Sequence, residues 1–440
     1  MAFIRSINNW VLLGAILAGP RLATAENQAA TVEPTASALS LADARRAAFL
    51  NNWDLLAAKS DVDVATAQKI VAREFPNPTL SLAAQKINAD NHPNSTSAGN
   101  DLWNRSYDTI TAVNQLFEIG GKRARRRESA AAGFAAAEAR LRDAHRLLAA
   151  AVARDYLAAL LAGENVNILK QSAASLRREA QIAETRLRAG DISKADKMQI
   201  EIAAARLELD AQTAEGNAVV ARIAVEVLVG IKNPTGAWVP GDTLEQLASL
   251  PFLASQVTPG AARPDVQAAE AARRKASADL KLQRAMRIPD PTFLLQYEHQ
   301  PPDQPNTVGF GVSFPLPLWN RNRGAISAAQ AMVDQAAVQA QKVFAQAVAD
   351  IVTAQISFNA ARARWQQYRN ELAPKSRQIR ETVVFAYENG GASLLDLLLA
   401  QRNDNEVRLA TAQAAADSAN TAAALRAALA TTPPTIFAKP

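Results

Sequence analysis

Apolar and polar residues alternate with a period of two in four short stretches of the chain. The clearest is "VGFGVSFPLPL" (residues 308–318), in which every second residue is apolar and those between are Gly, Ser or Pro. This alternation predicts a strand with one apolar face, about as long as a tilted strand that crosses a membrane. Weaker alternation predicts further strands near residues 79–82, 106–118 and 293–297. Polar loops separate the four strands into two hairpins.

Long Ala-rich stretches fill most of the remaining chain and lack the period of two. Residues 122–187 and 192–229 contain no proline and predict one pair of long helices. Residues 324–387 and 394–430 predict a second pair, in which Pro374 should kink the first helix. A helix of roughly 65 residues would be about 100 Å long. Helices of that length have no core of their own and must pack on neighbours.

The chain follows one plan twice. Each half begins with an Ala-rich helix, continues through a Pro-x-Pro motif into a β-hairpin, and ends in a pair of long helices. The halves are residues 41–231 and 263–430, with hairpins at about 78–119 and 291–318. The segment 232–262 is rich in Pro and Gly and predicts a connector rather than a domain.

The N-terminal residues have the features of a secretory signal peptide. Arg5 precedes a short apolar core, and "ATA" at 23–25 is an A-x-A cleavage site, so residues 1–25 are expected to be removed. An uncleaved N-terminal anchor is the alternative. Residues 26–40 then form an N-terminal segment, and residues 431–440 a C-terminal tail. No later apolar run is long enough to predict a transmembrane helix.

The borders between helix and strand carry proline or glycine. Proline lacks the N–H that a helix interior needs and favours extended geometry in the preceding residue. The helix-to-strand junctions are therefore expected at Pro76, Pro78, Pro289 and Pro291. The return junctions are expected at Gly120, Gly121, Pro315 and Pro317.

The turns within the two long helix pairs match each other. "RAGDISKAD" (188–196) aligns with "ENGGASLLD" (388–396). In each turn a glycine suits a left-handed helix end, a serine suits the next N-cap, and an aspartate falls in the first turn. These residues are Gly190, Ser193 and Asp196 in the first turn and Gly390, Ser393 and Asp396 in the second. Capping alone accounts for most of this pattern; the repetition indicates a further role.

Four strands are too few for a closed membrane barrel, which needs about eight or more. An open sheet edge cannot lie in lipid, because its backbone groups would stay unpaired. Either the strands form a small sheet in water, or several chains pool them. Three chains would pool twelve strands.

The repeat, the Pro-x-Pro motifs and the glycine-bearing turns together resemble the TolC-type outer-membrane factor family of Gram-negative bacteria. "FPNPTLSL" (75–82), "FEIGGKRARR" (117–126) and "VSFPLPLWNRNRG" (312–324) look like its CzcC-like branch, which serves heavy-metal efflux by resistance-nodulation-division (RND) pumps. The resemblance implies a mixed α/β membrane protein. A homotrimer would form a 12-stranded outer-membrane β-barrel, with four strands per chain, continuous with a long periplasmic α-helical barrel. The connector and the C-terminal tail would form a belt around that barrel.

The resemblance also implies partners and a gate. The turns at Gly190 and Gly390 would close the periplasmic end and contact an adaptor protein, which links the channel to an inner-membrane RND pump. Asp396 matches an aspartate that narrows the pore in this family, and a three-fold ring of Asp396 would favour cations. Leu399 stands where some relatives carry a second acid. A purely capping role for Asp396 is the alternative.

The run "GGKRARRR" (120–127) allows two interpretations. It marks the border of barrel and helix, with basic residues facing water or lipid headgroups, or it is a solvated helix start. Nucleic-acid binding is not expected of an exported chain whose net charge is +6 with well-mixed charges.

Candidate chemistry is sparse. The chain has no cysteine, which excludes disulfides, thiolate metal sites and an N-terminal lipidated cysteine. Its three histidines are His92, His145 and His299; they lack ligand spacing and are expected at the surface. We therefore predict no enzyme, no cofactor and no resident metal. Drug or organic-solute efflux and type I secretion share the fold, and a periplasmic coiled-coil structural protein is a more distant alternative.

Overall fold

The computed structural model describes four ranges of the chain, residues 38–85, 108–250, 263–300 and 304–430. The expected signal peptide, nearly all of the N-terminal segment and the C-terminal tail lie outside them. His92 and most of the first hairpin loop also lie outside them.

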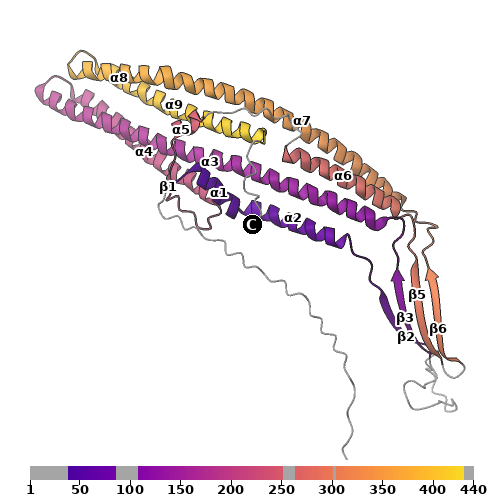
Figure 1. Ribbon diagram of the computed structural model, residues 1–440. Helices are drawn as coiled ribbons and strands as arrows, with labels where there is room; N and C mark the ends of the chain where they lie inside the picture. The colour runs from indigo at the N-terminus through magenta and orange to yellow at the C-terminus, as the bar shows by residue number, and fades with distance from the viewer. Residues whose placement is uncertain (1–37, 86–107, 251–262, 301–303, 431–440) are drawn as a thin grey trace, which may run out of the picture. The chain divides into compact units, whose positions relative to one another are not determined.

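Long helices dominate the described residues, as Figure 1 shows. The α-helices are α1 (Leu41–Asn51), α2 (Trp53–Val71), α3 (Lys122–Ala189), α4 (Lys194–Val229), α5 (Leu244–Ser249), α6 (Pro264–Ala285), α7 (Arg323–Gln367), α8 (Ala373–Glu388) and α9 (Leu394–Ala428). A π-helical turn, Tyr368–Leu372, joins α7 to α8, and Pro374 lies just after it. The distortion that Pro374 predicts takes the form of this turn.

The first half begins with two helices rather than the single one that its composition indicates. The break is at Asn52, whose backbone is extended (φ −64°, ψ 128°). Its side-chain oxygen accepts from the N–H of Leu55 at 3.1 Å and caps α2. Its amide nitrogen donates to the carbonyl of Leu228 near the end of α4, at 3.0 Å. One side chain thus serves the start of one helix and the end of another.

Four antiparallel strands form one sheet in the order β2-β3-β5-β6. They are β2 (Thr79–Gln85), β3 (Asp108–Leu116), β5 (Thr292–Gln300) and β6 (Gln304–Ser313). The two hairpins of the two halves therefore lie side by side, joined by the pairing of β3 with β5. Strands β2 and β6 are the two open edges of this sheet.

The last strand ends earlier than its sequence pattern predicts. Alternation continues to residue 318, but β6 stops at Ser313. Pro315 and Pro317 cannot donate to a strand ladder, so the chain leaves the sheet there although the alternation of apolar residues in the sequence continues. The expectation of an eleven-residue strand over 308–318 was wrong in its C-terminal half.

A hydrophobic core ties the connector to α3. Tyr156 on α3 is fully buried and stacks on Trp238 of the connector, with ring centroids 5.7 Å apart. The Tyr156 hydroxyl donates to the carbonyl of Leu39 at 2.7 Å. Leu39 belongs to the short strand β1 (Ala38–Leu39), which pairs in parallel with β4 (Val239–Pro240) of the connector. The connector is thus packed against the long helices.

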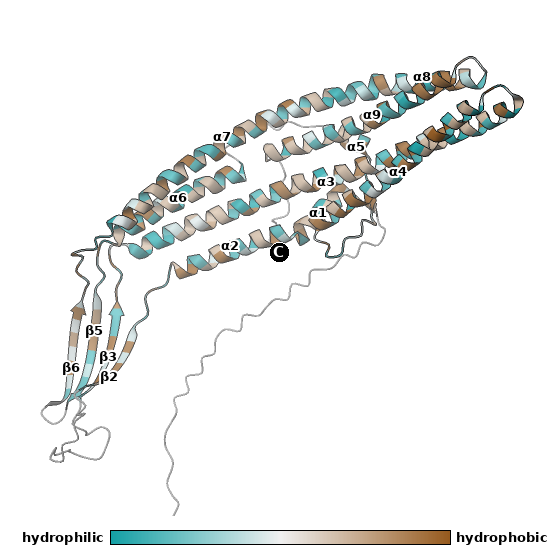
Figure 2. Ribbon diagram, turned by 180° about the vertical axis from the view of Figure 1, so that it is seen from behind, coloured by the Kyte–Doolittle hydropathy of each residue, from teal (hydrophilic) through white to brown (hydrophobic). Residues whose placement is uncertain are grey.

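Alanine fills most of the positions where helices meet. Figure 2 shows hydrophilic and hydrophobic residues mixed along every long helix, with no single helix that is apolar throughout. Among the helices of the described ranges, none has both the length and the apolar character needed to cross a membrane.

Candidate functional site

Two turns connect the helices of the two long pairs, one between α3 and α4 and one between α8 and α9. Both have the same backbone hydrogen bonds. Gly190 (φ 84°) and Gly390 (φ 76°) both adopt the left-handed conformation that favours glycine. The N–H of the residue after each glycine reaches back five positions, from Asp191 to the Arg186 carbonyl at 2.9 Å and from Gly391 to the Ala386 carbonyl at 2.7 Å. This is the Schellman arrangement of a helix end.

The following helices also begin alike. Ser193 and Ser393 are the N-caps of α4 and α9, and each serine oxygen accepts from the backbone N–H of the aspartate three residues on. Asp196 and Asp396 return the bond by accepting from the serine N–H, both at 3.1 Å. Hydrogen bonds from Ser393 lower the pKa of Asp396, so its carboxylate stays ionised at neutral pH. Both aspartates therefore have a capping role, whatever further role they have.

Contacts between the two turn regions involve residues that the sequence did not single out. Arg186 on α3 donates to the carbonyl of Tyr387 on α8 at 3.0 Å, and its guanidinium lies 5.0 Å from the centre of the Tyr387 ring. Tyr387 is buried with Ile200 and Leu397, one from each of the helices that follow the turns. The partners are about 200 positions apart in sequence, so no local pattern could have shown the contact.

A buried acid, Glu179, lies on α3 seven residues before Arg186. Glu179 on α3 is 6% exposed, and burial together with the nearby Glu388 raises its pKa. Its Oε2 has no hydrogen-bond partner in the described part of the chain. The single sequence gave no signal for it, because the residue falls within a long helix of mixed polarity.

The sheet has one apolar face, and that face is exposed. One row across the four strands is Leu80, Val113, Leu295 and Phe310, which are directly paired in register. Their exposed fractions run from 41% for Val113 to 91% for Phe310. Neighbouring rows on this face contain Leu82, Tyr297 and Val308, or Phe293 and Val312. A continuous exposed apolar surface of this kind marks an interaction with lipid or protein.

The opposite face of the sheet is mostly polar or small. Its rows include Ser81, Ala112, Gln296 and Gly309. Alternation of this kind, apolar on one face and polar on the other, is what a strand between lipid and a water-filled lumen requires.

The prolines of the Pro-x-Pro motifs lie between helix and sheet in both halves. Pro76 and Pro78 fall between the end of α2 and the start of β2, and Pro289 and Pro291 between α6 and β5. The carbonyls of Pro76 and Pro291 accept hydrogen bonds from Gln115 and Phe117 of the neighbouring segment, both at 2.9 Å.

The return junctions differ between the halves. Gly120 (φ 71°) and Gly121 (φ 74°) precede α3, and both adopt the left-handed conformation that favours glycine; a Cβ at Gly120 would also lie 2.8 Å from the Cδ1 of Ile288. In the second half, Pro315 and Pro317 lie in the exposed segment between β6 and α7.

The described residues contain no group of three His, Cys, Asp or Glu that could hold a metal ion. His145 is half-buried against Phe49, with ring centroids 5.1 Å apart, and burial lowers its pKa. His299 is 6% exposed. The expectation of a surface histidine was therefore wrong for His299, while His145 is partly exposed.

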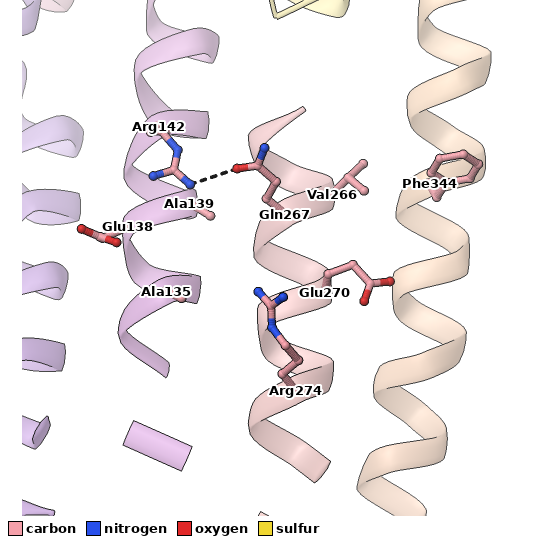
Figure 3. A pocket seen from close by; sticks show the side chains of 9 residues that line it. All are labelled: Ala135, Glu138, Ala139, Arg142, Val266, Gln267, Glu270, Arg274 and Phe344. Carbon is pink, nitrogen blue, oxygen red and sulfur yellow. Dashed lines mark hydrogen bonds between the residues drawn. The ribbon is translucent and has the colours of Figure 1, made fainter. Parts of the chain in front are cut away.

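A hollow of about 420 Å³ lies between α3, α6 and α7 (Figure 3). Arg142 donates to Gln267 across it at 3.0 Å. Its other charged side chains are Glu138, Glu270 and Arg274, an even mixture of signs without a nucleophile or a histidine. This hollow has no catalytic arrangement.

Comparison with known proteins decides the family. Residues 44–231 and 260–431 match the outer membrane efflux protein family, which leaves out chiefly the connector and the two ends. The chain belongs to this family. It is thus an outer membrane efflux channel protein and not an enzyme.

Two relatives are named for metal resistance. The cobalt-zinc-cadmium resistance protein CzcC of Cupriavidus metallidurans is 27% identical over 404 residues, covering 90% of this chain and 93% of the relative. The nickel-cobalt-cadmium resistance protein NccC of Alcaligenes xylosoxydans xylosoxydans is 25% identical over 301 residues, covering 66% of this chain and 65% of the relative.

Solved structures share the fold. CusC, described as forming a transmembrane channel, aligns with a TM-score of 0.75 at 19% identity, over 88% of this chain and 91% of its own. The outer membrane protein VceC of Vibrio cholerae aligns with a TM-score of 0.73 at 20% identity, over 88% and 95%. The expected fold class is confirmed by these matches.

Proposed function

We propose that this protein is the outer-membrane exit duct of a tripartite RND efflux system, and that it exports divalent heavy-metal cations of the cobalt, zinc and cadmium type. The main support for a role as an exit duct is the exposed apolar face of a sheet that has two open edges. One chain alone would leave the backbone groups of β2 and β6 unpaired in lipid, where each unsatisfied group costs several kcal/mol.

Three chains resolve this difficulty. Pairing β2 of one chain with β6 of the next would close twelve strands into a barrel, with the row Leu80, Val113, Leu295 and Phe310 toward lipid. The polar face with Ser81, Gln296 and Gly309 would line the lumen. The long helices of three chains would continue this lumen into the periplasm.

The turns at Gly190 and Gly390 then form the periplasmic end of the duct. In this assembly they close or narrow the pore and contact a periplasmic adaptor protein, which connects to the inner-membrane RND pump. A ring of three Asp396 carboxylates would concentrate negative charge there, which favours cations. No metal ligands are needed for this, because the cation is cargo and passes through.

The proposed metal substrate rests on the relatives CzcC and NccC, which are named for metal resistance and are 27% and 25% identical to this chain. Efflux of drugs or organic solutes, or type I secretion, by the same fold is the alternative. The test is a deletion strain compared with its parent on zinc, cobalt and cadmium salts and on a drug panel. We expect sensitivity to the metals alone, reversed by the wild-type gene on a plasmid.

Unchanged metal tolerance with raised drug sensitivity would assign the protein to drug efflux. Fractionation of the same parent strain checks the duct itself, which we expect as a trimer in the outer membrane. A soluble periplasmic monomer would contradict the duct for any substrate.

A further inference from the structure

The positive charge of the chain is concentrated where the sheet joins the helices. Four segments make this border, and together we call them the junction collar: residues 72–78, 117–128, 281–291 and 314–324. They contain eleven Lys and Arg but four Asp and Glu, an excess of seven positive charges. Because the whole chain carries +6, the rest of the molecule is close to neutral.

The acids of the collar are mostly used in internal ion pairs. Lys122, which is buried, binds Asp290 at 2.7 Å, and Arg126 binds Glu118. Glu128 pairs with both Arg125 and Lys281, at 2.9 and 2.7 Å. These contacts join the collar segments to one another. The collar has more arginines than acids, so several arginines remain without an acid of the collar as partner.

The surplus arginines are exposed and unpaired. Five of them have no carboxylate partner in the described ranges: Arg73, Arg127, Arg287, Arg321 and Arg323. Two of these, Arg287 and Arg323, line a hollow of about 690 Å³ together with Ser327 and one acid, Asp334, so the lining keeps an excess of one positive charge. Exposed arginines without a carboxylate partner in the described part of the chain are free to bind an anion from outside the fold.

Large apolar side chains lie beside these arginines. Phe314, Leu316 and Leu318 follow the end of β6, continue the apolar alternation of its sequence and are 57–64% exposed. Trp319, two residues before Arg321, is 93% exposed. Tryptophan and arginine next to an apolar band are typical of the border between hydrocarbon and headgroups.

We propose that the junction collar binds the headgroups of anionic phospholipids in the periplasmic leaflet of the outer membrane. The inference rests on the proposed membrane-spanning sheet, whose apolar face ends at the collar. Guanidinium groups bind phosphate oxygens with paired, charge-assisted hydrogen bonds, and the exposed Trp319 lies at the depth of the headgroups. The collar thereby fixes how deep the sheet sits in the bilayer.

The test measures lipid binding to the full-length protein purified in detergent, by native mass spectrometry. Phosphatidylglycerol and phosphatidylcholine are titrated separately. We expect phosphatidylglycerol to bind at least tenfold more tightly, with the preference lost in high salt, because ionic screening weakens it.

A triple variant locates the site. Arg287→Gln, Arg321→Gln and Arg323→Gln together should weaken phosphatidylglycerol binding by about a hundredfold, since each basic group near an anionic surface contributes about fivefold. The matched control is Arg140→Gln, Arg206→Gln and Arg377→Gln, which removes three exposed arginines on α3, α4 and α8 that also have no acid partner among the described residues. The control should bind as the wild type does.

Equal binding of both lipids by the wild type, or equal loss in the two triple variants, would overturn the proposal. Displacement of the lipid by millimolar inorganic phosphate would assign the collar to free phosphate and also overturn it. If the wild-type protein is trimeric in the outer membrane but shows no lipid preference, only the proposal that the junction collar binds lipid is contradicted. Absence of that trimer contradicts the proposed function.

Discussion

The two halves of the chain connect a late helix end to an early helix start with different chemistry. In the first half the end of α4 is hydrogen-bonded directly to Asn52 at the start of α2, whereas in the second half Arg146 of α3 links the end of α9 to Asp265 near the start of α6. The first joint is neutral: Asn52 caps one helix and donates to the other, and Gly230 lies against the backbone of Asn51. The corresponding helix ends of the two halves are thus held by different side chains.

The second joint is built from charges. Arg146 donates to the carbonyl of Ala427 at the end of α9, at 3.2 Å. Arg263, 4% exposed, precedes α6 and binds Asp265 at 2.6 Å and Asp350 at 3.1 Å. Those ion pairs lower the pKa of Asp265 and raise that of Arg263 against the opposing effect of burial. Breaking this joint should therefore cost more than breaking the neutral one.

The largest expected effect comes from the charged joint. Arg263→Ala removes a buried cation and leaves Asp265 without its main partner, which should lower the free energy of unfolding by about 3 kcal/mol. Asn52→Ala at the neutral joint should cost about 1 kcal/mol, the usual value of an N-cap. Thermal unfolding of both variants, with Arg206→Ala as an exposed control, measures the difference. Equal losses would mean that the two joints are equivalent.

A second comparison is between a glycine that lies against a neighbouring backbone and a glycine with open space around it. Gly230 (φ 88°) and Gly190 (φ 84°) both end a helix in the left-handed conformation. A Cβ at Gly230 would lie 2.3 Å from the carbonyl oxygen of Asn51, whereas one at Gly190 meets nothing within 4 Å. Gly190→Ala should cost about 1 kcal/mol from backbone strain alone, and Gly230→Ala at least twice that. Similar unfolding temperatures for the two variants would argue against the close joint.

The buried acid between the halves gives a smaller effect that depends on pH. Burial raises the pKa of Glu179, so the folded state favours its protonated form. Ionisation of Glu179 therefore lowers the free energy of unfolding. This loss is absent at acidic pH and grows as the pH rises above the pKa that Glu179 has in the unfolded chain. Glu179→Gln should raise the unfolding temperature at pH 7.5 and leave it nearly unchanged at pH 4. A gain independent of pH would mean that ionisation is not the cause.

The two turns provide the most delicate comparison, because Asp196 and Asp396 make the same capping bonds. Asp396→Asn keeps a hydrogen-bond acceptor and removes the charge, and should reduce cation selectivity about twofold in planar bilayers. Asp196→Asn is the matched variant and should change selectivity less. Identical traces for both variants and the wild type would leave Asp396 with its capping role alone.

Local chemistry was readable from the sequence and long-range contacts were not. The sequence predicts Ser193 and Ser393 as N-caps with an aspartate in the first turn of each helix, because these partners are three residues apart. Both N-caps are present, and the aspartates complete a capping box at each. The contact of Arg186 with Tyr387 joins two halves of the chain, and a single sequence carries no record of it.

Two other features differ from the predictions, one for a local reason and one for a long-range reason. The early end of β6 follows from the prolines within a pattern that otherwise continues. The break at Asn52 needed knowledge of Leu228, its partner on another helix. Whether the two turns gate a pore stays a prediction.

The central claim, that three chains pool their strands, can be tested by cross-linking the sheet edges. The chain has no cysteine, so pairs can be introduced without background. Leu82→Cys with Val308→Cys labels the two open edges, and Thr111→Cys with Tyr297→Cys labels two strands already paired within one chain. With a short bis-maleimide on intact outer membranes, the account predicts covalent dimers and trimers from the edge pair and monomers alone from the inner pair. Monomers alone from both pairs would contradict it.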